Sequence, residues 1–375
     1  MIRGWAHTGY AQRIVFGAGS VERVGQVCAD VGVGRVLVVT TAGRRASPAA
    51  ERLLGGLAAA GVAVSVFDGV RPHVPTTAVD AAAARAEADG VDGVVSFGGG
   101  SCADLGKAVC FAAERRSGRE TATYADRPVL AHVSVPTTYS GAELTPFFGS
   151  TDEATRRKSG TSSPVLAPVA AVYDPVVTLD TPARVSAETG MNALAHGVEC
   201  AYSPSRSPEA EALALACVER VAAALPGVVD DPGDLVARTA MLEGAVLGGR
   251  CLQNASMGVH HGLSQLLGGH TGLPHGLVNA LVLPHALRFN LDAIGLMAGR
   301  IGAALGDPAD PAGALARLRD RVGLPATLAE CGVTADDVDA AAHLSPGNAN
   351  VAANVRPVGV DDARAILTAA LGAGA

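Results

Sequence analysis

The chain has 375 residues, enough for two domains with sizeable cores, and hydrophobic residues make up 49% of it. Its net charge of −7 and its 3% of aromatic residues argue against nucleic-acid binding, which needs cationic surfaces and stacking side chains. We find no apolar run of the about 18 to 20 residues that a membrane-spanning helix needs. The N-terminal stretch also lacks a signal-peptide pattern, so we expect a cytoplasmic protein that binds no membrane.

Cysteine and lysine usage is informative. The seven cysteines are odd in number and contain no CxxC pair, which indicates reduced thiols rather than disulfides or a structural zinc site. We expect Cys102 and Cys251 to fill the core rather than act as nucleophiles. Lys107 and Lys158 are the only lysines in an arginine-rich chain. They reflect either chance or a need for a compact point charge.

The first half of the chain alternates strand-like and helix-like segments. We predict helices over 48–60 and 76–89, and a helix near the N-terminus that Ser20 caps. Strands are predicted over 13–16, 35–40, 62–67, 93–97, 129–135 and 170–173. Buried strands separated by helices are typical of a parallel sheet covered on both faces, so we predict an α/β, Rossmann-like dinucleotide-binding domain. The polar segment 150–163 is predicted to form a hairpin or loop.

Strand-like patterns almost disappear after Pro182. We predict helices over 185–202, 208–224, 234–252, 276–290, 291–305, 311–322, 335–342 and 360–371. The expected organisation is therefore an α/β domain over residues 1–177 and an all-α domain over residues 178–375, with a ligand cleft between them.

Two turns in the first half are candidate cofactor-binding loops. The strand over 93–97 runs into Gly98, Gly99 and Gly100, and only glycine lets a backbone come close enough to hold a diphosphate at a helix N-terminus. Glycine triplets also occur in turns that bind nothing. Lys107, on the following helix, either contacts a phosphate or pairs with Asp104 at i,i+3.

The second turn follows the strand over 129–135 and is rich in hydroxyls. We expect Thr137 and Thr138 to lie near the adenosine or the ribose of a dinucleotide. Thr40 ends the strand over 35–40, with Arg44 and Arg45 just beyond, and this uncharged end suits NADPH as well as NADH. The predicted cofactor-binding residues are Thr40, Gly98, Gly99, Gly100, Ser101, Asp104, Thr137, Thr138, Ser140, Thr145 and Lys158.

The stretch 260–290 holds half of the ten histidines: His260, His261, His270, His275 and His285. Its other residues are mostly Leu, Gly and Ala. Neutral imidazole suits both proton transfer and metal ligation near pH 7, so this stretch is a candidate active site. Any single histidine among them also fits a role in the core or at a helix end.

Five segments together resemble the iron-containing alcohol dehydrogenase superfamily, and within it the maleylacetate reductases. In chain order they are FGGGSCADLGKAV, PTTYSGAELTP, YDPVVTL, GMNALAHGVECAYSP and GLPHGLVNALVLPHALRFN. The resemblance implies the dehydroquinate synthase-like fold of that superfamily, an NAD(P)H-dependent oxidoreductase and a homodimer. It also places Lys158 at the cofactor and matches His73 to a histidine common in maleylacetate reductases.

In the metal-dependent members, one Asp and three His hold a divalent ion, and the matching positions here are Asn192, His196, His261 and His275. An amide in place of the carboxylate removes a charge and leaves a weaker ligand. We therefore expect no metal, although three histidines and an amide keep residual Zn²⁺ or Fe²⁺ binding open. Maleylacetate reductases carry Asn at this position and reduce a C=C bond without metal.

The resemblance leads to a mechanistic hypothesis. Hydride passes to the β-carbon of an enone carboxylate such as maleylacetate, giving 3-oxoadipate, while His196 and His261 stabilise the enolate. His275 donates a proton or holds the substrate, and Asn192 orients the substrate or a water. Gln265 stands where the family usually has a histidine; it can contact a carbonyl but cannot donate a proton near neutrality. For the substrate carboxylates the candidates are the cations Arg250, Arg356 and Lys158, although Lys158 is favoured for the cofactor; each could also be a surface ion pair. His73 is a further candidate substrate-binding residue, from the resemblance.

Other functions remain open at this point. They are a metal-dependent alcohol dehydrogenase acting on an aldehyde or ketone, a tailoring reductase of a biosynthetic pathway, and a ligand-binding relative without activity. A lyase or cyclase of the dehydroquinate synthase type is disfavoured because it needs a lysine-rich phosphate site and this chain has two lysines. The sequence leaves the substrate and the choice between NADH and NADPH undecided.

Overall fold

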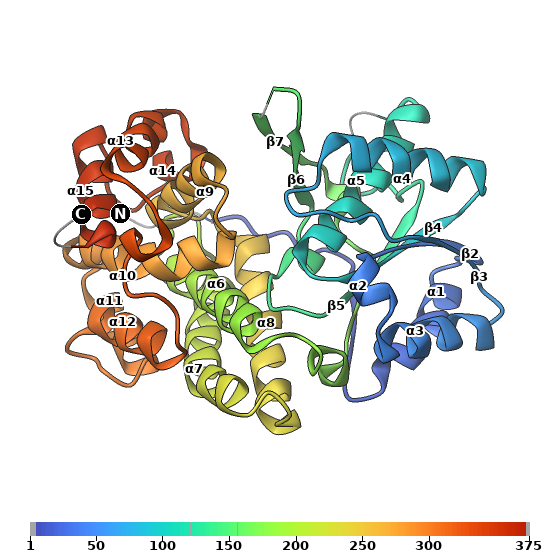
Figure 1. Cartoon of the computed structure of the whole chain (residues 1–375), viewed down its shortest axis with the longest axis horizontal. Coiled ribbons are helices and arrows are strands. Elements are labelled where there is room, and N and C mark those ends of the chain that lie inside the picture. Colours follow the sequence, from blue (N-terminus) through green and yellow to red (C-terminus); the bar gives the residue numbers. More distant parts are fainter. Residues whose placement is uncertain (1–4, 120–121, 156, 373–375) are drawn as a thin grey trace. The chain divides into compact units, whose positions relative to one another are not determined.

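The computed structural model describes residues 5–119, 122–155 and 157–372. These residues form two compact units, one over 9–181 and one over 182–372 that also includes 5–8. The first contains strands and helices, and the second is built from helices (Figure 1).

The α/β unit is built on a six-stranded sheet with the order β1-β8-β5-β4-β2-β3. Every adjacent pair of these strands is parallel. This confirms the predicted parallel sheet and the predicted return of the last strand to it. The strands are β1 (Arg13–Phe16), β2 (Arg35–Val39), β3 (Ala63–Phe67), β4 (Gly93–Gly98), β5 (Ala131–Pro136) and β8 (Ala170–Tyr173).

Helices cover both faces of this sheet. In β2, Val36 and Val38 join one apolar core while Leu37 and Val39 join another, because successive side chains of a strand point to opposite faces. The first core includes residues of α1 (Val24–Asp30) and α3 (Pro48–Ala59), and the second includes residues of α4 (Thr76–Ala88) and α5 (Gly100–Arg116) (Figure 1). A short helix, α2 (Ala42–Arg45), follows β2.

Two details of this unit differ from or extend the predictions. Ser20 does not cap a helix: it is the first residue of the 3-10 helix η1 (Ser20–Arg23). The residue before this helix, Gly19, has a left-handed conformation (φ 81°), and no side chain caps the helix start. The polar segment forms the antiparallel hairpin β6 (Phe147–Asp152) and β7 (Arg157–Ser162). Short 3-10 helices flank the hairpin and β8: η2 (Ala142–Leu144), η3 (Pro164–Leu166) and η4 (Pro175–Thr178).

The second unit is helical, as predicted. Several of its helices begin with the expected side-chain cap: Ser207, Asp234 and Thr334 each accept hydrogen bonds from backbone N–H groups of the first turn. Its longer helices are α6 (Ala183–Tyr202), α7 (Pro208–Asp230), α8 (Leu235–Asn254), α9 (Val259–Thr271), α10 (His275–Ile294), α11 (Leu296–Ala304), α12 (Pro311–Arg321), α13 (Ala335–Leu344) and α15 (Val360–Leu371). Shorter elements are η5 (Ala329–Cys331), η6 (Ser345–Gly347) and α14 (Ala349–Ala352).

Three helical predictions need correction. Helix α9 was not predicted at all. Helix α7 continues through Pro226 to Asp230 instead of ending near Ala224. The break between α10 and α11 falls at Gly295, which has φ 53°, rather than between residues 290 and 291.

One helix contradicts the expectation that no segment could cross a membrane. By length and composition alone, α7 is long and apolar enough to do so, with a mean hydropathy of 1.8. The helix packs against α6 and α8, and 39% of its apolar window is buried, including Ala214, Val218 and Val221. A core helix of this kind passes the same test as a membrane span.

Candidate active site

Three helices of the second unit bring together His196, His261 and His275. By contrast, His270 is exposed and pairs with Asp337, and His285 is half-buried. Asn192 and His196 lie one turn apart on α6, His261 lies on α9 and His275 begins α10. The rings of His196 and His261 stack with centroids 4.9 Å apart, and the ring of His275 lies 6.2 Å from that of His261. The structure therefore gathers three imidazoles from segments that are far apart in the sequence.

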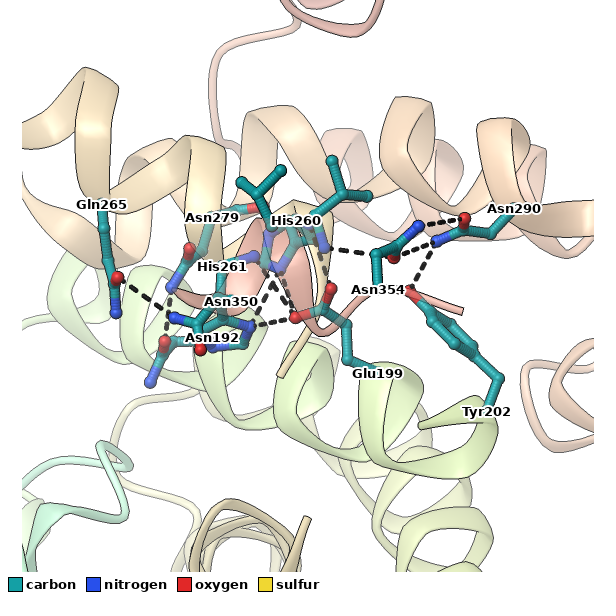
Figure 2. Close-up of polar contacts among 12 residues, drawn as sticks. Asn192, Glu199, Tyr202, His260, His261, Gln265, Asn279, Asn290, Asn350 and Asn354 are labelled. Carbon is teal, nitrogen blue, oxygen red and sulfur yellow. Dashed lines mark hydrogen bonds and ion pairs between the residues drawn. The ribbon is translucent and has the colours of Figure 1, made fainter. Parts of the chain in front are cut away.

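Asn192 is joined to this cluster through α10. The side-chain amide of Asn279 donates a hydrogen bond to Oδ1 of Asn192 over 2.5 Å. Asn192, His196 and His261 are buried, whereas His275 is half-buried. Figure 2 shows this amide pair near His260 and His261.

The structure adds Glu199, which the sequence-based predictions missed. It lies one turn after His196 on α6 and is fully buried. Its carboxylate accepts hydrogen bonds from the backbone N–H groups of His260 (3.0 Å) and His261 (3.3 Å), and from Nδ1 of His261 (2.5 Å) (Figure 2). The only sequence signal was an acidic residue on an otherwise apolar helix face, and charged residues are rarely buried unless paired.

The protonation pattern of the two adjacent histidines follows from their partners. A carboxylate accepts hydrogen bonds only, so Nδ1 of His261 carries the proton that points to Glu199. A carbonyl oxygen also only accepts, so Nε2 of His260 donates to the carbonyl of Asn279 (2.9 Å). Within residues 5–119, 122–155 and 157–372, Nε2 of His261 and Nδ1 of His196 are buried without a hydrogen-bond partner.

The electrostatics keep the Glu199 carboxylate charged and favour the neutral form of His196 and His261. Burial alone would raise the pKa of Glu199, but hydrogen bonds from His260 and His261 hold the pKa below its usual value. Burial lowers the pKa of His196 well below its ordinary value, and the nearby His261 and His275 lower it further. Burial also lowers the pKa of His261, against the opposing effect of Glu199.

The donor groups allow a test of metal binding. Glu199, His260 and His261 offer ligand atoms within 4.8 Å of one another, close enough for one ion. The 2.5 Å between Nδ1 of His261 and Oε2 of Glu199 is a hydrogen-bond length, whereas two ligands of one zinc ion at about 2.0–2.1 Å lie roughly 3.3 Å apart. These three groups therefore form a hydrogen-bond network.

The positions that match the metal ligands of the superfamily fit an ion poorly as well. Nε2 of His261 offers a lone pair, but the set contains no carboxylate, and Oδ1 of Asn192 is already engaged by Asn279. A divalent ion held there would lack the anionic ligand that offsets its charge.

The remaining predicted substrate residues lie at the edges of the helical unit. Gln265 is exposed, and its side-chain oxygen accepts from Asn350 (3.1 Å). Arg356 is exposed, lies over the ring of Phe289 (4.3 Å to the centroid) and donates to the Phe289 carbonyl. Arg250 donates to Gln253 on the same helix (2.8 Å).

In the α/β unit, the predicted cofactor loops meet at the carboxyl ends of adjacent strands. Gly98 of β4 pairs in register with Pro136 of β5, so the two loops leave the sheet side by side. A Cβ added at Gly99 would lie 3.1 Å from the hydroxyl of Thr138, and one at Gly100 would lie 3.2 Å from that of Ser140. Ser101 follows in the first turn of α5, half-buried. This edge of a parallel sheet is where dinucleotides bind in such folds.

Some predicted cofactor residues are engaged in holding this edge together. The buried hydroxyl of Thr40 donates to the carbonyl of Phe97 (2.7 Å), and the carbonyl of Thr137 accepts from Thr181 (2.7 Å). His73, in the same unit, is exposed in a left-handed conformation (φ 62°) and is followed by Val74 in another (φ 47°). The side chain of Lys158 lies outside the described residues.

Of the two roles predicted for Lys107, a phosphate contact or a pair with Asp104, the structure shows the pair. Its fully buried ammonium lies 2.9 Å from a carboxylate oxygen of Asp104 and donates to the hydroxyl of Thr145 (3.1 Å) and to the carbonyls of Ala142 (3.0 Å) and Phe147. Asp104 and Thr145, both predicted to contact the cofactor, are thus partners of Lys107.

Comparisons with known proteins agree with the fold and with the family resemblance. The model of the iron-containing alcohol dehydrogenase family matches residues 11–175, and that of the C-terminal domain of the same family matches residues 186–371. The chain is 37% identical to the maleylacetate reductase of Burkholderia cepacia over 355 residues, 95% of this chain and 94% of the relative. It is 39% identical to maleylacetate reductase 2 of Cupriavidus pinatubonensis over 306 residues, 82% and 79% of the two chains. The crystal structure of maleylacetate reductase from Agrobacterium tumefaciens superposes with a TM-score of 0.86 at 32% identity, covering 99% of both chains.

Proposed function

We propose that this chain, which belongs to the iron-containing alcohol dehydrogenase family, is an NAD(P)H-dependent reductase of the maleylacetate reductase type. Its reaction is the reduction of the C=C bond of an enone carboxylate, such as maleylacetate to 3-oxoadipate, without a metal ion. The observation that carries the proposal is the cluster of three imidazoles beside Asn192, whose side-chain oxygen is already hydrogen-bonded to Asn279. The likeness to maleylacetate reductases over most of the chain supports the substrate class.

In the proposed mechanism, hydride passes from C4 of the nicotinamide to the β-carbon of the enone, and negative charge collects on the ketone oxygen. His196 stabilises that oxygen by donating a hydrogen bond, because a buried hydrogen-bonding group held in place acts strongly in a site from which water is excluded. His261 was expected to share this role, but its Nδ1 proton is directed to Glu199 and its Nε2 carries a lone pair, so it accepts a hydrogen bond from the enol hydroxyl or from a water instead. His275, which is half-buried, returns the proton or holds the substrate. Asn192 orients the substrate or a water, and Gln265 contacts a carbonyl.

Further proposals concern binding and location. NADH or NADPH binds at the edge formed by Gly98–Ser101 and Thr137–Ser140, with Lys158 close to the cofactor. Arg250, Arg356 and His73 bind the carboxylates of the substrate. We also propose a homodimer, from the family resemblance, and a cytoplasmic location, because all seven cysteines of the described chain are free thiols.

The main test measures the oxidation of NADH and of NADPH with maleylacetate as substrate. It compares untreated protein with protein that has been dialysed exhaustively against EDTA and assayed in its presence. We expect turnover that EDTA leaves unchanged. Stoichiometric iron or zinc together with chelator-sensitive reduction of aldehydes would instead establish a metal-dependent alcohol dehydrogenase, the alternative that the three retained imidazoles favour.

The variant Asn192→Asp sharpens this test. A carboxylate at position 192 can accept the hydrogen bond from Asn279 with one oxygen and offers a second oxygen as an anionic ligand. We expect Zn²⁺ to bind at least about tenfold more tightly to the variant than to the wild type, the scale on which changes around a metal site act. Calorimetric titration with Zn²⁺ measures this directly, and equal affinities would contradict the proposed reason for metal independence.

A further inference from the structure

We infer that Glu199 is a positioning residue that caps helix α9 and holds His261 in the tautomer whose Nε2 presents a lone pair to the active site. The significance of this role for catalysis rests on the proposed function. The orientation of His261 itself rests only on the contacts within the helical unit.

The start of α9 is the first observation that supports this role. This helix begins at Val259, and its N-cap residue, Gly258, has no side chain with which to satisfy the first N–H groups. The carboxylate of Glu199, supplied by α6, accepts from two of them, those of His260 and His261. A carboxylate at a helix N-terminus also interacts favourably with the helix dipole. Glu199 therefore replaces a local cap.

Gly258 provides the second observation. A Cβ at this position would lie 2.8 Å from Oε1 of Glu199 and 2.8 Å from Oδ1 of Asn354, too close for either contact to persist. The amide of Asn354 accepts from the N–H of Val259 (3.2 Å) and exchanges hydrogen bonds with Asn290 of α10 (2.9 and 3.0 Å) (Figure 2). The absence of a side chain at Gly258 thus lets two remote polar groups reach the helix start.

The ring of His261 is fixed on several sides. Glu199 accepts from its Nδ1, the ring of His196 stacks on one face at 20° between planes, and Nδ1 of His260 lies 3.2 Å from its Nδ1. Because His260 carries its proton on Nε2, its Nδ1 is an acceptor. The N–H at Nδ1 of His261 therefore makes a bifurcated hydrogen bond, to Glu199 and to Nδ1 of His260. The only nitrogen of His261 left to meet a ligand is Nε2, which is buried and has no partner in the described chain.

Nε2 of His261 is therefore the atom that accepts a hydrogen bond from an enol hydroxyl or from a water next to it. A histidine in the opposite tautomer would place an N–H there and a lone pair against a carboxylate. In that arrangement two acceptors would face each other in a buried site, which is costly.

The experiment compares Glu199→Gln and Gly258→Ala with the wild type. Gln keeps the shape of Glu but replaces one acceptor oxygen with a donor group. Gly258→Ala retains the Glu199 side chain but pushes its carboxylate away from the start of α9, and the extended backbone of Gly258 (φ −120°, ψ −151°) is open to alanine. The matched control is Gly269→Ala on the same helix, where an added Cβ has nothing within 4 Å.

Two measurements are made on each protein. ¹⁵N NMR of histidine-labelled, ligand-free protein reports which ring nitrogen of His261 is protonated, with the signal assigned by its loss in His261→Gln. Steady-state kinetics with maleylacetate gives kcat and the KM for NAD(P)H. In both test variants we expect the ¹⁵N pattern of an Nδ1-protonated His261 to disappear and kcat to fall about 100-fold, while the KM for the cofactor stays the same. Gly269→Ala should match the wild type in both.

Each outcome decides the assignment. An unchanged ¹⁵N pattern in a folded Glu199→Gln protein overturns it, and so does a changed pattern with unchanged kcat. If Glu199→Gln does not fold, the same two measurements on Gly258→Ala decide the question. If the wild type does not reduce maleylacetate, the proposed function fails while the NMR comparison, made without substrate, still decides the role of Glu199.

Discussion

A buried charge in the α/β unit and a buried charge in the helical unit have different surroundings. In the α/β unit, Lys107 is satisfied by Asp104, a hydroxyl and backbone carbonyls, all of which belong to α5 or to the loop and strand that follow β5. In the helical unit, Glu199 bonds to His261, whose other ring nitrogen has no partner among the described residues. The Lys107 network thus consists of partners within the protein, whereas the Glu199 network ends at Nε2 of His261, which has no hydrogen-bond partner among the described residues.

This difference separates a structural charge from a functional one. A buried ion whose partners are all internal stabilises only the local arrangement, because removing it leaves a charge or a carbonyl unpaired. Other buried polar atoms of the described residues also have no partner, among them Nδ1 of His132 in the α/β unit. What distinguishes Nε2 of His261 is its place beside the rings of His196 and His275, where a ligand can complete the hydrogen bonding.

The largest expected effect is that of removing His261, at the end of the Glu199 network. His261→Gln should lower kcat for maleylacetate reduction by about 10²- to 10⁴-fold, the usual worth of a positioned proton-transfer or hydrogen-bonding group. Binding of NADPH, followed by fluorescence titration, should not change. His270→Gln is the matched control, because His270 lies on the same helix but is exposed and pairs with Asp337. Equal losses in both variants would contradict the distinction.

The next effect should appear in stability rather than in activity. Lys107→Met should lower the free energy of unfolding by about 3 kcal/mol, because it leaves Asp104 and several carbonyls without their cation. Urea denaturation measures this. Arg116→Met, on the same helix, removes only a surface pair with Glu87 and should cost less than about 1 kcal/mol. A Lys107→Met protein as stable as this control would show that the Lys107 network is not a structural support.

The last prediction concerns the dependence of stability on pH, which is a small effect over any one pH unit. His132 is buried in the α/β unit, with Nε2 2.8 Å from the hydroxyl of Ser96, and burial lowers its pKa to about 3, with Lys107 contributing. Because the unfolded chain takes up the proton first, near pH 6.5, stability is lost as the pH falls below that value. The expected loss is about 1.4 kcal/mol per pH unit down to about pH 4.

The measurement for this prediction is the slope of unfolding free energy against pH, from urea denaturation at pH values between about 4 and 7. His132→Asn should have a shallower slope than the wild type, whatever its stability at neutral pH. The exposed His343→Asn should keep the wild-type slope. Identical slopes for all three proteins would refute the contribution of His132.

Much of the fold was predictable because its signals are local. The strands of the sheet are continuous apolar runs, and most helices begin at a Ser, Thr or Asp cap or at a proline. Helix α9 escaped prediction for a physical reason. Its cap comes from Glu199, which lies on α6 and reaches the start of α9 only through tertiary packing. The sequence of α9 is also rich in glycine and histidine, which are weak helix formers.

The site was predictable in part for the same reason. Asn192 and His196 share one helix face by spacing, and the family resemblance placed His261 and His275 beside them. The amide bond from Asn279 and the carboxylate of Glu199 follow from packing between α6, α9 and α10, which no local pattern encodes. Lys107 illustrates the converse: a motif lysine that suggested phosphate binding is engaged within the protein.

The pairing of Asn192 with Asn279 bears on how this reductase relates to its metal-dependent relatives. The amide of Asn279 can donate to an aspartate as readily as to an asparagine, so a carboxylate at position 192 needs no rearrangement of the neighbouring helix. Asparagine and aspartate codons differ by a single nucleotide. If the proposed metal-free function holds, one mutational step separates it from metal-assisted chemistry, because the scaffold accepts either residue.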